Sequence, residues 1–214
     1  MAHAANRFIT SLKSFNRKER FFLVGWALGN RGFRLEPVFT RQLSSELALD
    51  VPSDAFVAMD YHLDWIYASA FLSVTDGAEA VHSNRDRLIS GNQEDIDLVV
   101  AFDDGNPAHL IMVEAKGVTG WTNKQATSKA RRLEAIFGQR GDGWPGIQPH
   151  FVIVSPRESE GLDCRSWPGW MKREDGRPHW MRMEIPSGLL RVTRCDEAGK
   201  VTAAGGHWKV VGSR

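Results

Sequence analysis

Residues 95–117 of the chain read DIDLVVAFDDGNPAHLIMVEAKG, and this stretch decides the fold that we expect. The apolar run over 95–102 is typical of a strand, and residues 103–107 are typical of a turn. A second apolar run continues over 110–116, as a buried strand paired with the first would. The stretch therefore predicts a hairpin of two strands near the middle of the chain.

Charged side chains lie in phase on these two predicted strands. Side chains alternate across a strand, so Glu114 and Lys116 share one face. On the partner strand Asp95 and Asp97 share one face, and the apolar residues beside them take the other. Because the turn is short, the two polar faces coincide. The hairpin is thus predicted to present a carboxylate cluster with one ammonium.

This cluster has the chemistry of a metal-dependent phosphodiesterase. Mg²⁺ prefers oxygen ligands and typically takes one or two protein carboxylates, which Asp97 and Glu114 supply. Lys116 would lie beside the metal-bound water, where it can orient the nucleophile and offset charge on the phosphate. A solvated strand face would carry the same residue types, but the apolar neighbours favour a buried strand.

The arrangement resembles the PD-(D/E)xK nuclease superfamily. Asp97 is followed by sixteen residues and then by Glu114-Ala115-Lys116 at the end of an apolar strand. The resemblance covers roughly residues 16–155, and the Pro that often precedes the aspartate is absent. It implies an α/β, restriction-endonuclease-like core, a mixed β-sheet flanked by helices.

The resemblance also implies the reaction and the ligand set. It implies hydrolysis of phosphodiester bonds by an endonuclease, with DNA favoured as the substrate. Asp97, Glu114 and the Ala115 backbone carbonyl would hold Mg²⁺, for which Mn²⁺ can substitute. Glu19 is a further candidate ligand, although a capping box with Asn16 also explains it. Asp95 is either a second acidic group near the metal or the polar start of its strand.

A helix predicted over 123–137 supplies the candidate contacts to nucleic acid. Gln125, Lys129 and Arg132 fall on one flank of this helix and could donate to backbone phosphates. An ordinary solvated face would carry the same residues. Some members of the superfamily have Tyr four residues after this Gln, where the present chain has Lys129. The net charge of +1 neither supports nor excludes DNA.

The rest of the chain is assigned by its turn residues and periodicity. Helices are predicted over 17–28, 41–49 and 54–70, and a strand over 151–154. We expect a nuclease core over 1–156 and a mostly β C-terminal extension over 157–214, packed on the core, with strands over 180–185 and 189–195. The tryptophans of the extension close a small core or stack on unpaired bases.

Composition narrows the class of protein. The 214 residues, 42% hydrophobic and 25% charged, are typical of a globular chain. No apolar run reaches the ~18 residues of a membrane span, and no signal peptide is evident, so we expect a cytoplasmic protein without a membrane partner. Cys164 and Cys195 are expected to be free thiols. A homodimer would suit a nuclease that cuts two strands.

Two other functions are consistent with these residues. The chain could be a non-cleaving nucleic-acid-binding or assembly protein of the same fold. It could also be a phosphohydrolase that acts on small substrates such as nucleotides. Metal binding without turnover would indicate the first, and activity on nucleotides alone would indicate the second.

Overall fold

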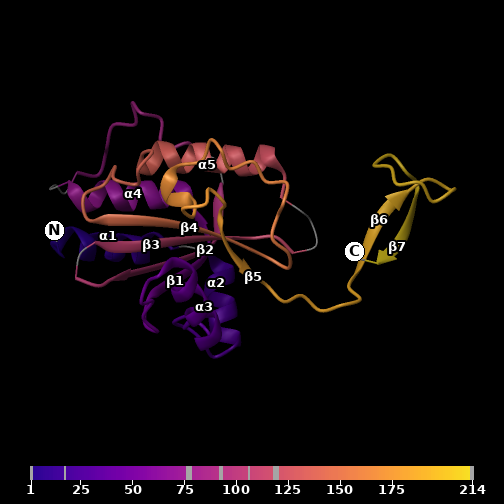
Figure 1. The fold of residues 1–214 in the computed structure, drawn as a ribbon, viewed down its shortest axis with the longest axis horizontal. Helices are drawn as coiled ribbons and strands as arrows, with labels where there is room; N and C mark the ends of the chain where they lie inside the picture. Colours follow the sequence, from indigo (N-terminus) through magenta and orange to yellow (C-terminus); the bar gives the residue numbers. More distant parts are fainter. Residues whose placement is uncertain are drawn as a thin grey trace.

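The body of the protein is a mixed five-stranded sheet covered by helices (Figure 1). The computed structural model describes residues 2–16, 18–75, 79–91, 94–105, 107–117 and 121–212. Its elements, in chain order, are α1 (Ala2–Phe15), α2 (Glu19–Ala27), α3 (Pro37–Leu47), β1 (Phe56–His62), α4 (Leu63–Val74), β2 (Asp95–Asp103), β3 (Ala108–Ala115), α5 (Asn123–Phe137), β4 (Ile147–Ser155), the short 3₁₀ helix η1 (Gly169–Met171), β5 (His179–Arg182), β6 (Leu190–Cys195) and β7 (His207–Gly212).

The strands of the sheet are arranged in the order in which they occur along the chain. β1, β2 and β3 pair antiparallel, which confirms the predicted hairpin of β2 and β3. β4 and β5 then add in parallel. A parallel neighbour needs a crossover connection, and α5 supplies it between β3 and β4. The fold is therefore of the α/β class and its sheet is mixed, as the sequence predicts.

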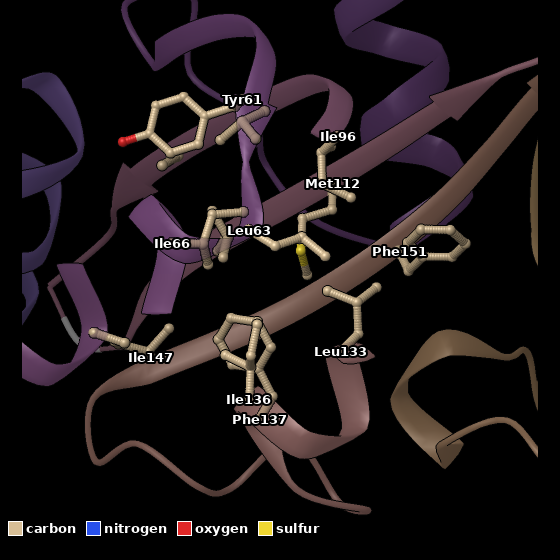
Figure 2. Close-up of a cluster of buried hydrophobic side chains, with 14 of the residues drawn as sticks. Tyr61, Leu63, Ile66, Ile96, Met112, Leu133, Ile136, Phe137, Ile147 and Phe151 are labelled. Atoms are coloured by element: carbon tan, nitrogen blue, oxygen red, sulfur yellow. The ribbon is translucent and has the colours of Figure 1, made fainter. Parts of the chain in front are cut away.

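Two apolar clusters hold the helices to the two faces of the sheet. The larger one joins α1, α4 and α5 to the sheet and is drawn in Figure 2, where Ile66 of α4 and Leu133 of α5 lie close to Met112 of β3. The smaller one packs Leu43 of α3 against the other face, on Val100 and neighbouring residues. Figure 1 shows α4 and α5 on one side of the sheet and α3 on the other.

The predicted helix over 54–70 is wrong in its first half. Residues 56–62 form β1, which pairs with β2 from Phe56↔Ala101 to His62↔Asp95, and the helix α4 begins only at Leu63. The spacing of Phe56 and Leu63 suits a helix locally, but pairing with β2 satisfies the backbone of this segment in the sheet and overrides the local pattern. β1 is thus an edge strand of the sheet and pairs antiparallel with β2, which carries Asp97.

The N-terminal helices also differ from the prediction. α1 was not predicted, although Ala5, Phe8 and Leu12 are fully buried at helical spacing and anchor it on the body. The predicted helix over 17–28 corresponds to α2, and Arg17 lies outside the described residues. The capping box of Asn16 is wrong, because the N-cap is Lys18 and has no side-chain capping bond.

The chain after residue 156 has two parts. Residues 157–182, which the sequence assigns to the extension, supply β5 to the sheet and the buried Trp167 and Met171 to the larger cluster. β6 and β7 form a separate two-stranded sheet that stands away from the body in Figure 1. In the described part of the chain, no helix is long and apolar enough to cross a membrane.

Candidate active site

The site lies where β2 and β3 separate. Their pairing runs from Asp103↔Ala108 to Leu98↔Val113, and Asp97 is the next residue of β2. At this position a side chain takes the place of the backbone pairing between the strands. The Oδ2 atom of Asp97 accepts a hydrogen bond of 2.7 Å from the backbone amide of Ala115. This bond places Asp97 against the backbone of the Glu114-Ala115-Lys116 segment.

An irregularity in β1 accompanies this separation. Asp60 has a φ of 50°, and the register of β1 with β2 passes from Met59↔Leu98 to Tyr61↔Ile96. The alternation of β2 is broken at this point, since Ile96 belongs to the larger apolar cluster while Leu98 packs against the smaller one on the other face. The prediction of unbroken alternation through Asp95 and Asp97 is therefore wrong.

Glu114 is the buried carboxylate of the site. Glu114 is 4% exposed, and Nζ of Lys129 on α5 donates a hydrogen bond to its Oε1. Burial raises the pKa of Glu114 to about 7, even though the ammonium of Lys129 acts to lower it. The charge of Asp97 raises this pKa further and that of Lys116 lowers it. The two predicted metal-binding carboxylates thus influence each other electrostatically.

Lys116 extends over an aromatic ring. Its Nζ lies 5.3 Å from the centroid of the Trp121 ring, within the range of a cation–π interaction. The backbone amide of Lys116 donates to the carbonyl of Val154 on β4 at 2.9 Å, which anchors this end of β3. The ammonium therefore lies over the Trp121 ring and is close enough to Glu114 to lower the pKa of that carboxyl group.

Lys129, predicted as a contact to nucleic acid, lines the pocket and also contacts the carboxylate of Glu114. Besides Glu114 it donates to the carbonyl oxygen of Asp95, and its side chain is 15% exposed. It therefore points from α5 into the carboxylate cluster rather than toward solvent. Its position four residues after Gln125 indicated a residue near the site, but the sequence did not show that its partner is Glu114.

Asp95 is held by a second set of side chains. Its Oδ2 accepts from Lys18 Nζ at 2.9 Å, and its Oδ1 contacts His62 Nδ1. Oδ2 of this carboxylate is thus hydrogen-bonded to an ammonium, whereas the buried Oδ1 lies against the imidazole of His62 without a hydrogen bond from the part of the chain that the structure describes. Lys18 and His62 were not predicted as members of the site, because they precede Asp95 by 77 and 33 positions and only the folded sheet brings them together.

A pocket of about 310 Å³ opens at this cluster. It combines carboxylates, ammonium groups and aromatic walls. Its lining residues are Glu94, Asp95, Glu114, Lys116, Trp121, Gln125, Ala126, Ser128, Lys129, Phe151 and Trp167. Asp97 is not part of this lining. Its carboxylate is connected to the site by the hydrogen bond from the backbone amide of Ala115. The volume lies at the lower end of the range for small-ligand sites.

Glu19 and Arg132 also lie outside the pocket. Glu19 is exposed at the start of α2 and is not among the residues that line the pocket. Arg132 binds Asp64 at 2.8 Å and the carbonyl of Leu88, with 16% of its side chain exposed. These contacts engage Arg132 within the protein. Gln125 does line the pocket and is exposed, as a contact to substrate requires.

Asp97 and Glu114 are side chains of the chemical type that Mg²⁺ takes as protein ligands. Within the described ranges, no group of three or more His, Cys, Asp or Glu side chains is placed to hold a metal ion. Mg²⁺ is often held by one or two carboxylates, with water and substrate phosphate as its other ligands. Asp97 and Glu114 supply two carboxylates, and the charge of Asp97 is close enough to Glu114 to raise its pKa. Lys129 now provides the positive charge next to Glu114.

Comparisons with protein-family models, with curated proteins and with solved structures give no significant match to this chain.

Proposed function

We propose that this chain is a metal-dependent nuclease that hydrolyses phosphodiester bonds, with DNA as its substrate. The observation that supports the proposal is the convergence of Asp97, Glu114 and Lys116 at the point where β2 and β3 separate. Two carboxylates with a neighbouring ammonium at the end of a buried strand are suited to phosphoryl chemistry.

We further propose that the body is a restriction-endonuclease-like fold. The antiparallel pair β2 and β3 carries the three residues, α5 follows them, and β4 adds in parallel. This order of elements is the one that the resemblance to the PD-(D/E)xK superfamily implies. The proposal of the fold and that of the activity therefore rest on the same segment of the chain.

Each residue has a role in the proposed reaction. Asp97, Glu114 and the Ala115 carbonyl would hold Mg²⁺. When bound, the ion would lower the pKa of a coordinated water and neutralise charge on the phosphate. Lys116, free to leave the face of Trp121, would orient the attacking water and offset negative charge on the phosphate oxygens. Gln125 would contact the substrate at the open side of the pocket.

Lys129 is the cationic neighbour of Glu114. Its ammonium contacts Oε1 of the same carboxylate that would ligate the ion. Negative charges at Asp97 and Glu114 repel each other, and the ammonium of Lys129 offsets part of that repulsion. For this oxygen to act as a metal ligand, Lys129 has to move away from it.

The test is cleavage of supercoiled plasmid, single-stranded DNA and RNA in Mg²⁺ or Mn²⁺. Lys116→Met should lower the cleavage rate by about 10²-fold or more, because it removes a charge that acts on the transition state. Lys124→Met is the matched control, since Lys124 is an exposed lysine at the start of α5 and does not line the pocket. It should cleave at the wild-type rate.

Metal titration separates the alternatives. Calorimetry with Mg²⁺ or Mn²⁺ should show binding by the wild type and weaker binding by Asp97→Asn. Metal binding without cleavage of any polynucleotide would replace the proposal with a non-cleaving binding protein. Hydrolysis of mononucleotides alone would replace it with a small-substrate phosphohydrolase, for which a pocket of about 310 Å³ is large enough.

A further inference from the structure

The C-terminal hairpin has an apolar face that lies in solvent. β6 and β7 pair with Val192 opposite Val210 and Arg194 opposite Trp208. Because paired residues of an antiparallel ladder share a face, Leu190, Val192, Trp208 and Val210 lie together on one side. These four side chains, here called the hairpin face, are 51–69% exposed. The opposite side carries polar residues such as Lys209 and Thr193.

The hairpin buries little apolar surface of its own, since its buried Cys195 lies on the side away from the hairpin face. It stands away from the body in Figure 1, joined to β5 by residues 183–189. Its internal order comes from backbone pairing and from Arg194, which donates to the carbonyl of Gly205 at 2.9 and 3.2 Å. An isolated two-stranded hairpin is marginally stable at best in water. A well-formed hairpin with an exposed apolar face therefore needs a surface to pack on.

The body also exposes large apolar side chains within one short segment. On and just after α2, Phe22, Leu23, Trp26 and Leu28 are 55–76% exposed. We call these four residues the α2 patch. Figure 1 shows the hairpin far from α2 of the same chain. Neither surface is covered in the isolated chain.

We propose that the chain forms a two-fold symmetric dimer in which the hairpin face of each copy packs on the α2 patch of the other. Both surfaces are apolar, and an exchange of arms covers both of them twice. Exchange of an identical element is a low-cost route to a dimer, and residues 183–189 form the connection that permits it. This inference does not depend on the proposed nuclease activity.

The areas favour this pairing over contact between two hairpins. Each of the exposed side chains offers on the order of 100 Å². The hairpin face and the α2 patch of one copy together give roughly 800 Å², the area that each partner buries in a stable interface. Contact of one hairpin face with another would bury only about half of that. The second copy's α2 patch is therefore the surface that matches in chemistry and in extent.

Analytical ultracentrifugation of the full chain tests the proposal. The wild type should sediment as a dimer that dissociates on dilution. Val192→Asp on the hairpin face and Trp26→Asp on the α2 patch should each weaken dimerisation by about 100-fold or more, because a symmetric dimer loses the contact twice. Val201→Asp is the matched control, since Val201 is 58% exposed but bridges to Cys195, whose side of the hairpin is the opposite one.

Disulfide trapping identifies the surface on which the hairpin face packs. A chain with Val192→Cys, mixed with a differently tagged chain with Leu28→Cys, should give a crosslinked heterodimer under mild oxidation. A chain with both changes that crosslinks only within itself would overturn the proposal, because the hairpin would then cover its own α2 patch. So would a monomeric wild type at every concentration, or a dimer that Val192→Asp and Trp26→Asp leave unchanged.

Discussion

The buried carboxyl group of Glu114 makes the stability of the metal-free protein depend on pH. Burial raises its pKa from 4.5 to about 7 in the folded protein. Between these values the unfolded chain has lost the proton while the folded protein keeps it. The free energy of unfolding that this group contributes is thus fully present below pH 4.5 and is lost as the pH rises through 7.

The size of the effect follows from the shift. A pKa difference of one unit corresponds to about 1.4 kcal/mol, so the contribution of Glu114 is about 3 kcal/mol between the two limits. Glu114→Gln keeps the volume of the side chain and an oxygen that accepts from Lys129, but it removes the charge. Relative to the wild type, the variant should gain about 3 kcal/mol of stability as the pH rises through this range.

Urea unfolding in a metal chelator, repeated across this pH range, measures the difference between the two proteins. The difference is what counts, since other groups titrate in the same window and cancel between wild type and variant. Glu160→Gln, at an exposed glutamate, should follow the wild type at every pH. If the difference in free energy of unfolding between wild type and Glu114→Gln stays constant with pH, burial does not raise the pKa of Glu114 and the reasoning is refuted.

Three further predictions concern packing and buried charge. Burial, aided by two neighbouring histidines, lowers the pKa of His150 to about 3, so stability present above pH 6.5 is lost as the pH falls toward 3. His150→Phe should lack this loss in acid unfolding curves, and an unchanged acid dependence would contradict the shift. Leu133→Ala should lower the free energy of unfolding by about 2–5 kcal/mol in urea, because Leu133 is fully buried; a loss below about 1 kcal/mol would show that the cavity collapses. Arg132→Ala should cost about 1–3 kcal/mol by leaving the partly buried carboxylate of Asp64 without its cationic partner, whereas Arg131→Ala on the exposed face should change the melting temperature little. Equal effects of the two arginines would contradict the structural role of Arg132.

Segments with a strong local pattern were predicted well. The predicted helix 123–137 has the bounds of α5, and the strand predicted over 151–154 lies within β4. The hairpin of β2 and β3 was predicted because a short turn joins two apolar runs, so their pairing needs little loop closure. The segment over 56–62 was assigned incorrectly, because its strand forms by pairing with residues that lie far along the chain.

The sequence of the candidate site indicated which residue types meet but not all of their partners. Asp97, Glu114 and Lys116 could be named from their phase on two neighbouring strands. Lys129 was expected at a phosphate and also contacts Glu114. Arg132 was expected on the same flank and is engaged by Asp64, which lies 68 positions earlier. Helical spacing gives the direction of a side chain within its helix but not the surface that the helix faces.

By itself, the sequence determined the class of the sheet, its central hairpin and the identity of the charged residues on it. Those features depend on side-chain alternation and on short connections, which are local properties of the chain. The tertiary structure alone decided that β1 joins the sheet, that Lys18 and His62 lie against Asp95, and that Lys129 contacts Glu114. These contacts form between distant segments because burying a charge requires a partner, and only the packed fold determines which partner lies within reach.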